Sequence, residues 1–180
     1  MLWLVRHGQS AAPAGVAVGA SDPPLSAAGL AQAQATAADL ATQPLTAVYS
    51  SDRRRAISTA AVIAGVQGLD VAVDARLNEL DFGAWEGRDL AELWQLEPAA
   101  AAAWERDLAR TPPSFGENLA QLQARVASFW DELRERAGGE VAIVAHRGSL
   151  SVLWSIVAGL EPGATLARAW EPGAAIRVEP

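Results

Sequence analysis

The chain has 180 residues, a formal net charge of −7 and no cysteine. This length suits a single domain over residues 1–180, and the missing cysteines exclude disulfides, thiolate metal sites and a cysteine nucleophile. The negative charge argues against general binding of nucleic acid or of anionic membranes. All 14 basic residues are arginine, so a Walker-type phosphate loop and Schiff-base chemistry are excluded as well.

No apolar run approaches the ~18 residues of a membrane span. The N-terminal "LWLV" is too short for the core of a signal peptide, and an arginine follows it directly. We therefore expect a cytoplasmic protein.

Apolar runs alternate with helical patterns along the chain. In the first part of the chain we expect a strand at 1–5, a loop at 9–24, a helix at 27–42 capped by Ser26, a strand at 45–51 and a helix at 52–65 that stops at Gly65. The middle part is expected to contain a strand at 71–73, an irregular segment at 76–87, helical structure over 89–110 and a break at 110–118. The last part is expected to contain a helix at 119–137, a strand at 141–145, a helix at 149–159 and one or two edge strands within 164–179. Strands that alternate with helices favour a three-layer α/β/α fold around a mainly parallel sheet.

The two histidines of the chain stand in the same local setting. His7 and His146 each follow an apolar strand, and glycine comes within two residues, at Gly8 and Gly148. A lone histidine beside a strand is more often structural, but the repeated arrangement favours a functional role. In α/β folds ligands bind at the carboxyl ends of the strands, so we expect both histidines in one site.

Arginines accompany both histidines. Arg6 precedes His7, Arg147 follows His146, and residues 53–55 are three consecutive arginines at the start of a predicted helix. Guanidinium groups match phosphate oxygens, whereas like charges repel a divalent cation. We therefore expect a phosphate site that uses neither a metal nor a cofactor. Helices that start after Gly8 and Gly148 would add backbone N–H donors.

A neutral imidazole beside a phosphate favours covalent catalysis. Histidine attacks phosphorus and holds it as a phosphoramidate, and nearby arginines lower its pKa so that the attacking nitrogen stays free. A carboxylic acid then protonates the leaving oxygen. The candidates within residues 76–87 are Glu79, Asp81 and Glu86.

The segments "LVRHG", "SSDRRRAISTA", "LNELDFGAWEG" and "VAHRG" together resemble the histidine phosphatase family, also called phosphoglycerate-mutase-like. The resemblance covers nearly the whole chain, in the family's order. It implies an α/β fold of that type, a small phosphomonoester substrate and His7 as the phosphorylated nucleophile.

The same resemblance assigns further site residues. It implies a phosphate pocket completed by Arg6, Arg55 and His146, with Arg55 singled out because the family has arginine directly before Ala56. It also places Glu79 at the acid/base position, which leaves Asp81 and Glu86 with structural roles.

A narrower likeness lies outside these motifs. Residues 18–33, 112–126 and 148–164 look like those of α-ribazole phosphatases, which remove the 5′-phosphate of α-ribazole during cobalamin assembly. The chain departs from this pattern at three positions: Pro13 replaces a common asparagine, Asn118 replaces serine, and Arg147 replaces glycine. We interpret Asn118 as a conservative exchange of a helix cap.

Alternatives remain at this point. A phosphoglycerate-type mutase is less favoured, because mutase relatives are longer and carry extra segments over the site. A non-catalytic phosphate-binding protein is less favoured because His7 and Glu79 are both present, and a metal-dependent hydrolase is weaker still. Gln9, Ser10, Trp85 and Arg147 are candidates for the substrate rim, and Trp170 is a candidate for a homodimer edge.

Overall fold

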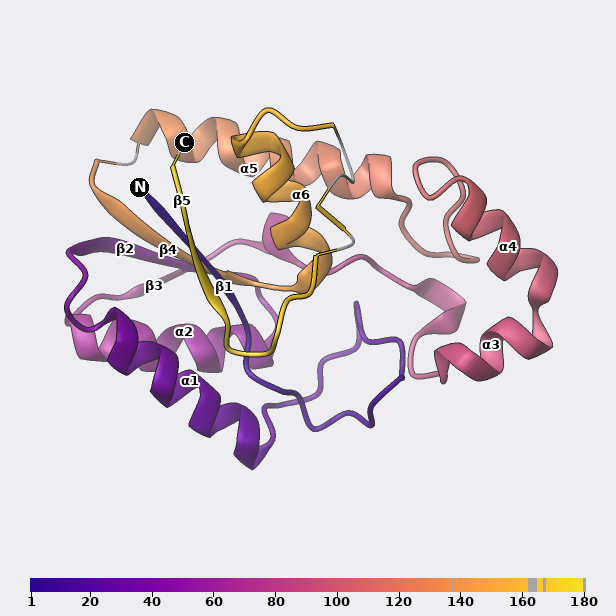
Figure 1. Ribbon diagram of the computed structural model, residues 1–180, viewed down its shortest axis with the longest axis horizontal. Helices are drawn as coiled ribbons and strands as arrows, with labels where there is room; N and C mark the ends of the chain where they lie inside the picture. The colour runs from indigo at the N-terminus through magenta and orange to yellow at the C-terminus, as the bar shows by residue number, and fades with distance from the viewer. Residues whose placement is uncertain (137, 162–164, 167, 180) are drawn as a thin grey trace.

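A five-stranded sheet organises the chain in the computed structural model, which describes residues 1–136, 138–161, 165–166 and 168–179. Within these residues the strand order is β3-β2-β4-β1-β5 (Figure 1). The strands β1 (Leu2–Arg6), β2 (Leu45–Ser50), β3 (Val71–Val73) and β4 (Glu140–Ala145) are parallel, whereas β5 (Ala175–Val178) is antiparallel to β1. The predicted mainly parallel sheet is confirmed.

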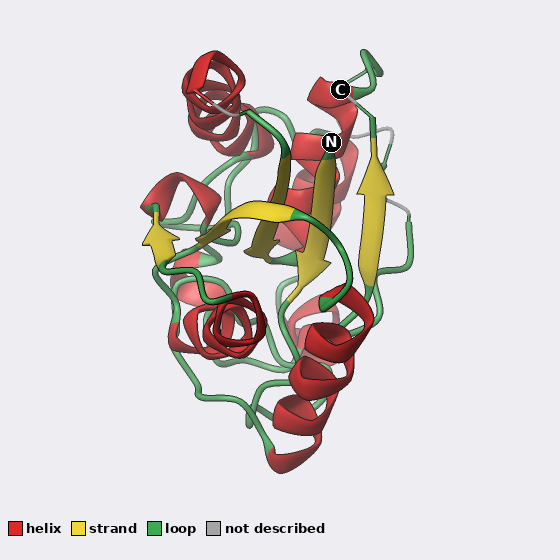
Figure 2. Ribbon diagram, turned by 90° about the vertical axis from the view of Figure 1, so that its left-hand side faces the viewer, coloured by secondary structure: helices red, strands yellow, loops and turns green. Residues whose placement is uncertain are grey.

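Helices cover both faces of the sheet (Figure 2). Along β4, Val141 and Ile143 pack into the apolar cluster of α5 (Leu119–Arg136) and α6 (Arg147–Val157). The alternate residues Ala142 and Val144 pack into the cluster of α1 (Ala27–Leu40) and α2 (Arg54–Gln67). Successive side chains of a strand point to opposite faces, so a continuous apolar run is what a doubly covered strand requires. The three-layer prediction is confirmed.

The predicted end of α2 at Gly65 is wrong. The helix runs to Gln67 and ends at Gly68, which adopts a left-handed conformation with φ of 67°. A glycine inside a helix lowers its stability by only about 1 kcal/mol relative to alanine. Gly68 instead supplies the left-handed residue that commonly terminates a helix.

The predicted helical stretch 89–110 is two short helices, α3 (Leu90–Leu96) and α4 (Pro98–Arg106). Pro98 disfavours helical geometry at the preceding Glu97, whose φ and ψ are −127° and 51°. The irregular segment before them contains two single 3₁₀ turns, η1 (Ala75–Leu77) and η2 (Gly83–Trp85). Figure 1 shows α3 and α4 to one side of the sheet.

Two tryptophans have different positions from those expected. Trp85 is 2% exposed and packs edge-on against Trp104, with ring centroids 5.6 Å apart. Trp170 is also 2% exposed, and its indole donates a hydrogen bond to Ser151 Oγ (2.9 Å). A side chain this buried offers no surface to a second subunit, so Trp170 does not provide the expected dimer edge.

The remaining boundaries differ slightly from expectation. The predicted helix 119–137 ends at Arg136, and residue 137 lies outside the described residues. The tail contains one strand, β5, in its described part, and residues 164 and 167 of the predicted tail lie outside it. In the part of the chain that the structure describes, the helices are too short or too polar to cross a membrane.

Candidate active site

The two histidines meet at one edge of the sheet. β1 and β4 are neighbours, and their last residues Arg6 and Ala145 lie opposite each other in the register. His7 directly follows β1, and its backbone N–H donates to the carbonyl of Ala145 (3.0 Å). The rings of His7 and His146 lie edge to face, with centroids 4.9 Å apart. The structure therefore brings together two residues that are 139 positions apart, because parallel strands end at the same edge.

The local geometry of His7 fixes its tautomer. Its Nδ1 lies 2.7 Å from the carbonyl oxygen of Gly8. A carbonyl only accepts hydrogen bonds, so Nδ1 carries the hydrogen and Nε2 keeps a free lone pair. Burial, together with the positive charges of Arg55 and Arg6, lowers the pKa of His7 to about 3. His7 is therefore a neutral imidazole with an available Nε2 at neutral pH.

The buried, neutral state of His7 makes stability depend on pH. The unfolded chain gains a proton near the ordinary pKa of 6.5, whereas the folded chain gains it only near 3. The contribution is therefore complete above pH 6.5 and is lost as the pH falls towards 3. Between pH 7.5 and pH 5 the wild type should lose about 2 kcal/mol more unfolding free energy than His7→Asn. Urea unfolding of both proteins at both pH values measures this difference, and parallel losses would contradict it.

His146 is buried and is held through one nitrogen of its ring. It is fully buried, and its Nε2 lies 2.7 Å from Ser51 Oγ at the end of β2. Burial lowers the pKa of His146 well below its ordinary value, as do the adjacent His7 and Arg55. The helix α6 begins at once after His146, two residues earlier than predicted. The reason is that His146 caps it in extended geometry, with its N–H donating to Ser149 Oγ (3.3 Å).

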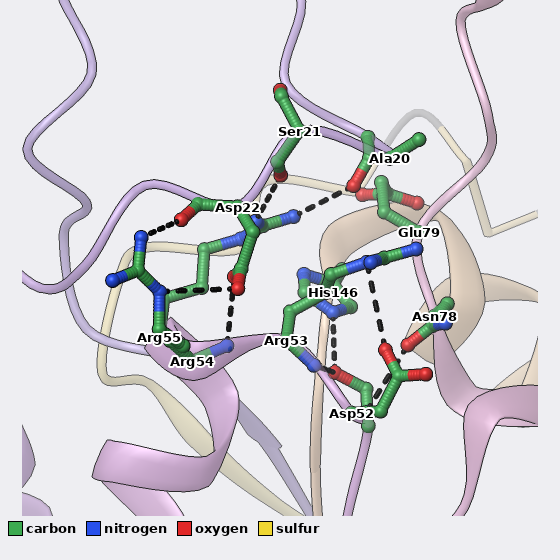
Figure 3. Close-up of polar contacts among 12 residues, drawn as sticks. Ala20, Ser21, Asp22, Asp52, Arg53, Arg54, Arg55, Asn78, Glu79 and His146 are labelled. Carbon is green, nitrogen blue, oxygen red and sulfur yellow. Dashed lines mark hydrogen bonds and ion pairs between the residues drawn. The ribbon is translucent and has the colours of Figure 1, made fainter.

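The arginines of residues 53–55 point in different directions (Figure 3). Arg55 is 1% exposed, and its guanidinium donates to the carbonyls of Ser21 (2.8 Å) and Gly19 (3.1 Å). The side chain of Arg54 is 63% exposed and pairs with Asp22 (3.1 Å). Arg55 is thus the arginine that the α2 N-terminus holds inside the molecule, and Arg54 faces solvent.

Arg6 is a second cation near His7, and it is partly buried. Its guanidinium donates to the carbonyl of Trp170, and burial lowers its pKa. The negative charge of Glu79 opposes that shift at both Arg6 and Arg55. Glu79 therefore lies within electrostatic reach of both arginines.

Glu79 is held by two backbone N–H groups. Its Oε2 accepts from Gly148 (3.0 Å) and its Oε1 accepts from Leu80 (2.9 Å). A Cβ at position 148 would overlap Oε1 of Glu79, so the glycine makes room for the carboxylate. The Gly148 N–H was expected to face a phosphate, and the structure gives it to Glu79 instead. The expected helix after Gly8 is also absent from the described chain: the Gly8 N–H donates to Thr59 Oγ1 (3.1 Å) and a loop follows.

Glu86 organises the loop that holds Arg55. Its carboxylate accepts hydrogen bonds from the backbone N–H groups of Gly19, Ala20, Ser21 and Phe82 and from the hydroxyl of Ser21, at 2.6–3.1 Å. These contacts orient the carbonyls of residues 19 and 21 towards Arg55. The role is structural, as the sequence resemblance implies for Glu86.

The predicted rim residues are dispersed. Gln9 is exposed, and its backbone N–H donates to Gln32 (2.8 Å), while Ser10 forms a single β-bridge with Leu25. Arg147 is exposed at the start of α6 and donates to the Leu166 carbonyl (3.1 Å). Trp85 does not join them, because the tryptophan cluster of α3 and α4 buries it.

The structure places two of the departures from the α-ribazole pattern, Asn118 and Pro13. Asn118 Oδ1 accepts from the Gln121 N–H, and Gln121 Oε1 accepts from the Asn118 N–H, both at 2.9 Å. This reciprocal capping confirms the predicted helix cap. Pro13 is exposed in the loop before α1.

Two pockets flank Glu79, and sequence reasoning did not anticipate either. One, of about 230 Å³, is apolar and is bounded by Leu80, Trp104 and Arg147 among others. The other, of about 400 Å³, is largely polar and includes Arg53, Asn78 and Gln121. Figure 3 shows Arg53 beside His146 and Glu79. These residues come from distant segments, so no local sequence signal brings them together.

Among the described residues, no group of three or more histidine, aspartate and glutamate side chains is arranged to hold a metal ion.

Comparison with known proteins gives one consistent family. Residues 2–180 match the histidine phosphatase superfamily (branch 1). The chain is 32% identical over 174 residues to phosphoserine phosphatase 1 of Hydrogenobacter thermophilus, covering 96% of this chain and 81% of the relative. It is 33% identical over 161 residues to the adenosylcobalamin/α-ribazole phosphatase of Escherichia coli, covering 88% of this chain and 79% of that relative.

A solved structure extends the likeness to the fold. The α-ribazole phosphatase from Shigella flexneri superposes with a TM-score of 0.89 at 31% identity, covering 99% of this chain and 90% of that one. Agreement of motifs, fold and nearly the full length leads to one conclusion: the chain belongs to branch 1 of the histidine phosphatase superfamily.

Proposed function

We propose that this protein is a phosphomonoester hydrolase that transfers the phosphoryl group through His7. The observation that carries the proposal is the His7 Nδ1–Gly8 hydrogen bond, which leaves a neutral Nε2 within electrostatic reach of Arg55 and Arg6. A free imidazole nitrogen near cations suits nucleophilic attack on an anionic phosphate.

In the first step, Nε2 of His7 attacks phosphorus and the bond from phosphorus to the ester oxygen breaks. Arg6, Arg55 and His146 bind the phosphate oxygens and the planar transition state. A proton held by Glu79 passes to the leaving oxygen, so that an alcohol and not an alkoxide departs. The contacts of Glu79 with two backbone N–H groups fix the position of its carboxyl group.

In the second step, water attacks the phosphorus of phosphohistidine and the P–N bond breaks. Glu79 accepts the proton of that water, and inorganic phosphate and neutral His7 are produced. Both steps balance without a metal ion or redox partner.

The identity of the alcohol that the enzyme releases is a separate part of the proposal. We propose α-ribazole 5′-phosphate as a candidate substrate, on the likeness of residues 18–33, 112–126 and 148–164 to α-ribazole phosphatases. Relatives named for phosphoserine are equally similar in sequence, so the substrate needs a direct assay.

The assay that tests the proposal compares three esters. Purified protein is given α-ribazole 5′-phosphate, phosphoserine and 3-phosphoglycerate, with and without excess chelator. We expect release of inorganic phosphate, the fastest rate on α-ribazole 5′-phosphate, no 2-phosphoglycerate and no effect of the chelator. Isomerisation without phosphate release would indicate a mutase. Phosphate binding without turnover of any ester would indicate a binding protein.

The neighbouring arginines provide a matched pair for testing the phosphate site. Arg55→Ala should lower turnover by about 10²–10³-fold, the usual loss for one electrostatic contact to a transition state. Arg54→Ala should stay within a few-fold of wild type, because its side chain faces solvent and Asp22. Circular dichroism and thermal unfolding check that both variants fold. An inactive Arg54→Ala beside an active Arg55→Ala would refute the assignment.

A further inference from the structure

The larger pocket beside Glu79, here called the polar pocket, is lined by polar side chains and an aromatic ring that have no role in the proposed phosphate chemistry. Its volume is about 400 Å³, within the range of small-molecule sites in proteins. Its wall is formed by the start of α2, the segment around η1, the loop before α5 and the first turn of α5. Side chains that line it include Arg53, Asn78, Glu79, Asp81, Phe115 and Gln121.

Several polar groups of this wall retain unused hydrogen-bonding capacity. Asn78 Oδ1 accepts from the Asp52 N–H (3.2 Å), and Gln121 Oε1 is occupied by its cap contact. Across the described chain, the amide nitrogens of these two side chains have no protein partner. Asp81 accepts from the Gly83 N–H through Oδ1 (2.8 Å) and keeps Oδ2 free. Free donors and a free acceptor on one wall match hydroxyl groups, which both donate and accept.

Arg53 adds a further donor. Its Nε is buried and lies 3.6 Å from Asp52 Oδ1, too far for a hydrogen bond. Within the described residues the guanidinium of Arg53 makes no hydrogen bond. The Arg53 side chain is 26% exposed and lines the polar pocket, so its terminal guanidinium nitrogens, rather than the buried Nε, can donate to a ligand oxygen there.

The charges of the polar pocket do not favour a second anion. Its wall has two cations, Arg53 and Arg125, and three acidic side chains, Glu79, Asp81 and Glu117. In the proposed mechanism Glu79 holds a proton when the ester binds, so the charge of Asp81 is the one that remains to balance Arg53. Arg125 is already paired with Glu117 through two contacts of 2.7 Å. The buried Arg55 and the partly buried Arg6 are not part of this wall. A carboxylate on the alcohol portion of a substrate would therefore meet no surplus positive charge here.

Phe115 gives the polar pocket an apolar edge. Its side chain is 97% exposed, and its backbone has φ of 61°, a left-handed conformation that costs energy for any residue with a Cβ. The loop is nonetheless fixed, because the Ala84 N–H donates to the Ser114 carbonyl and the Glu117 N–H donates to the Asp81 carbonyl, both at 2.8 Å. An exposed aromatic ring that lines a pocket, on a loop whose backbone is fixed, suits stacking on a ring of a ligand.

We propose that the polar pocket binds the alcohol portion of the substrate and selects a neutral, hydroxyl-bearing ring such as a pentose. Phe115 lies against one face of that ring, and Asn78, Asp81 and Gln121 bind its hydroxyls. The proposal rests on the proposed function for the position of the phosphate, and it predicts discrimination against phosphorylated carboxylic acids.

The charge selection is tested with two esters that differ in one group. Glycerol 3-phosphate carries a hydroxymethyl group where 3-phosphoglycerate carries a carboxylate. We expect wild-type kcat/KM to be at least about tenfold higher for glycerol 3-phosphate. Asp81→Asn keeps the Oδ1 contact and removes one negative charge, so this ratio should fall about tenfold. Gln121→Glu keeps its cap oxygen and adds a negative charge, so the ratio should rise. Unchanged ratios in both variants would overturn the charge argument.

The ring selection is tested with Phe115→Gly, which removes the ring and suits the left-handed backbone. We expect kcat/KM for ribose 5-phosphate to fall about tenfold, while the value for glycerol 3-phosphate stays within twofold. Equal changes on both substrates would refute stacking.

Binding to His7→Ala separates this proposal from the proposed function. Calorimetry on that variant should show ribose 5-phosphate binding more tightly than 3-phosphoglycerate by about tenfold, and Phe115→Gly in the same background should weaken only the former. Absence of this preference overturns the pocket assignment even if the wild type hydrolyses phosphate esters. Its presence supports the assignment even if hydrolysis fails.

Discussion

His7→Ala should lower the rate of phosphomonoester hydrolysis by on the order of 10⁴-fold or more, as expected when the nucleophile of a covalent mechanism is removed. The side chain that remains beside the phosphate, His146, has its Nε2 engaged by Ser51 and cannot substitute without moving. Steady-state phosphate release on the best substrate measures the loss.

The control for this variant is ligand binding. Arg6, Arg55 and His146 remain in His7→Ala, so inorganic phosphate should still bind, and thermal unfolding at pH 7.5 should remain cooperative. A residual rate within tenfold of wild type would mean that another group attacks phosphorus.

Glu79→Gln should separate substrates by the quality of their leaving group. An alkyl alcohol leaves poorly as an anion, so removing the acid should slow phosphorylation by about 10²–10⁴-fold. A nitrophenolate leaves without a proton, so nitrophenyl phosphate should lose much less in that step. Single-turnover measurements on both esters test this difference. A burst of nitrophenol should appear if attack by water on phosphohistidine becomes limiting, because the same carboxylate serves that step.

Comparing two esters also separates the loss of proton donation from the loss of a structural hydrogen bond in Glu79→Gln. Both carboxylate oxygens of Glu79 accept backbone N–H groups, from Leu80 and Gly148. An amide has one acceptor oxygen, so Glu79→Gln loses one of these contacts whatever the substrate. Only the difference between the two esters reports proton donation. Equal losses on both would contradict the acid role, and a larger difference in Asp81→Asn would transfer it to Asp81.

Local sequence patterns predicted the central strands of the sheet and the position of the two histidines at their ends. The apolar runs at 2–5 and 141–145 correspond to neighbouring strands, and His7 and His146 follow them directly. This succeeded because burial on both faces leaves a continuous apolar signature, and parallel strands end at one edge of the sheet.

Features set by contacts between distant segments were not predictable. Gly148 donates to a carboxylate 69 positions away, so its N–H could not be assigned from the glycine alone. Trp85 resembled a rim residue because glycines surround it, yet Trp94 and Trp104 bury it. The polar pocket is lined by residues that range from Ala20 to Arg125 in the sequence. The left-handed backbone of Phe115 has no local sequence signal, because it is not a glycine.

The measurement that tests the central claim most directly is location of the covalent intermediate. The protein is mixed briefly with a substrate carrying labelled phosphate, quenched without acid and digested, and the label is mapped by mass spectrometry. We predict an acid-labile, base-stable label on the peptide that contains His7, and no label in His7→Ala. Label on His146 or on a serine, or turnover without any phosphoenzyme, would contradict the account.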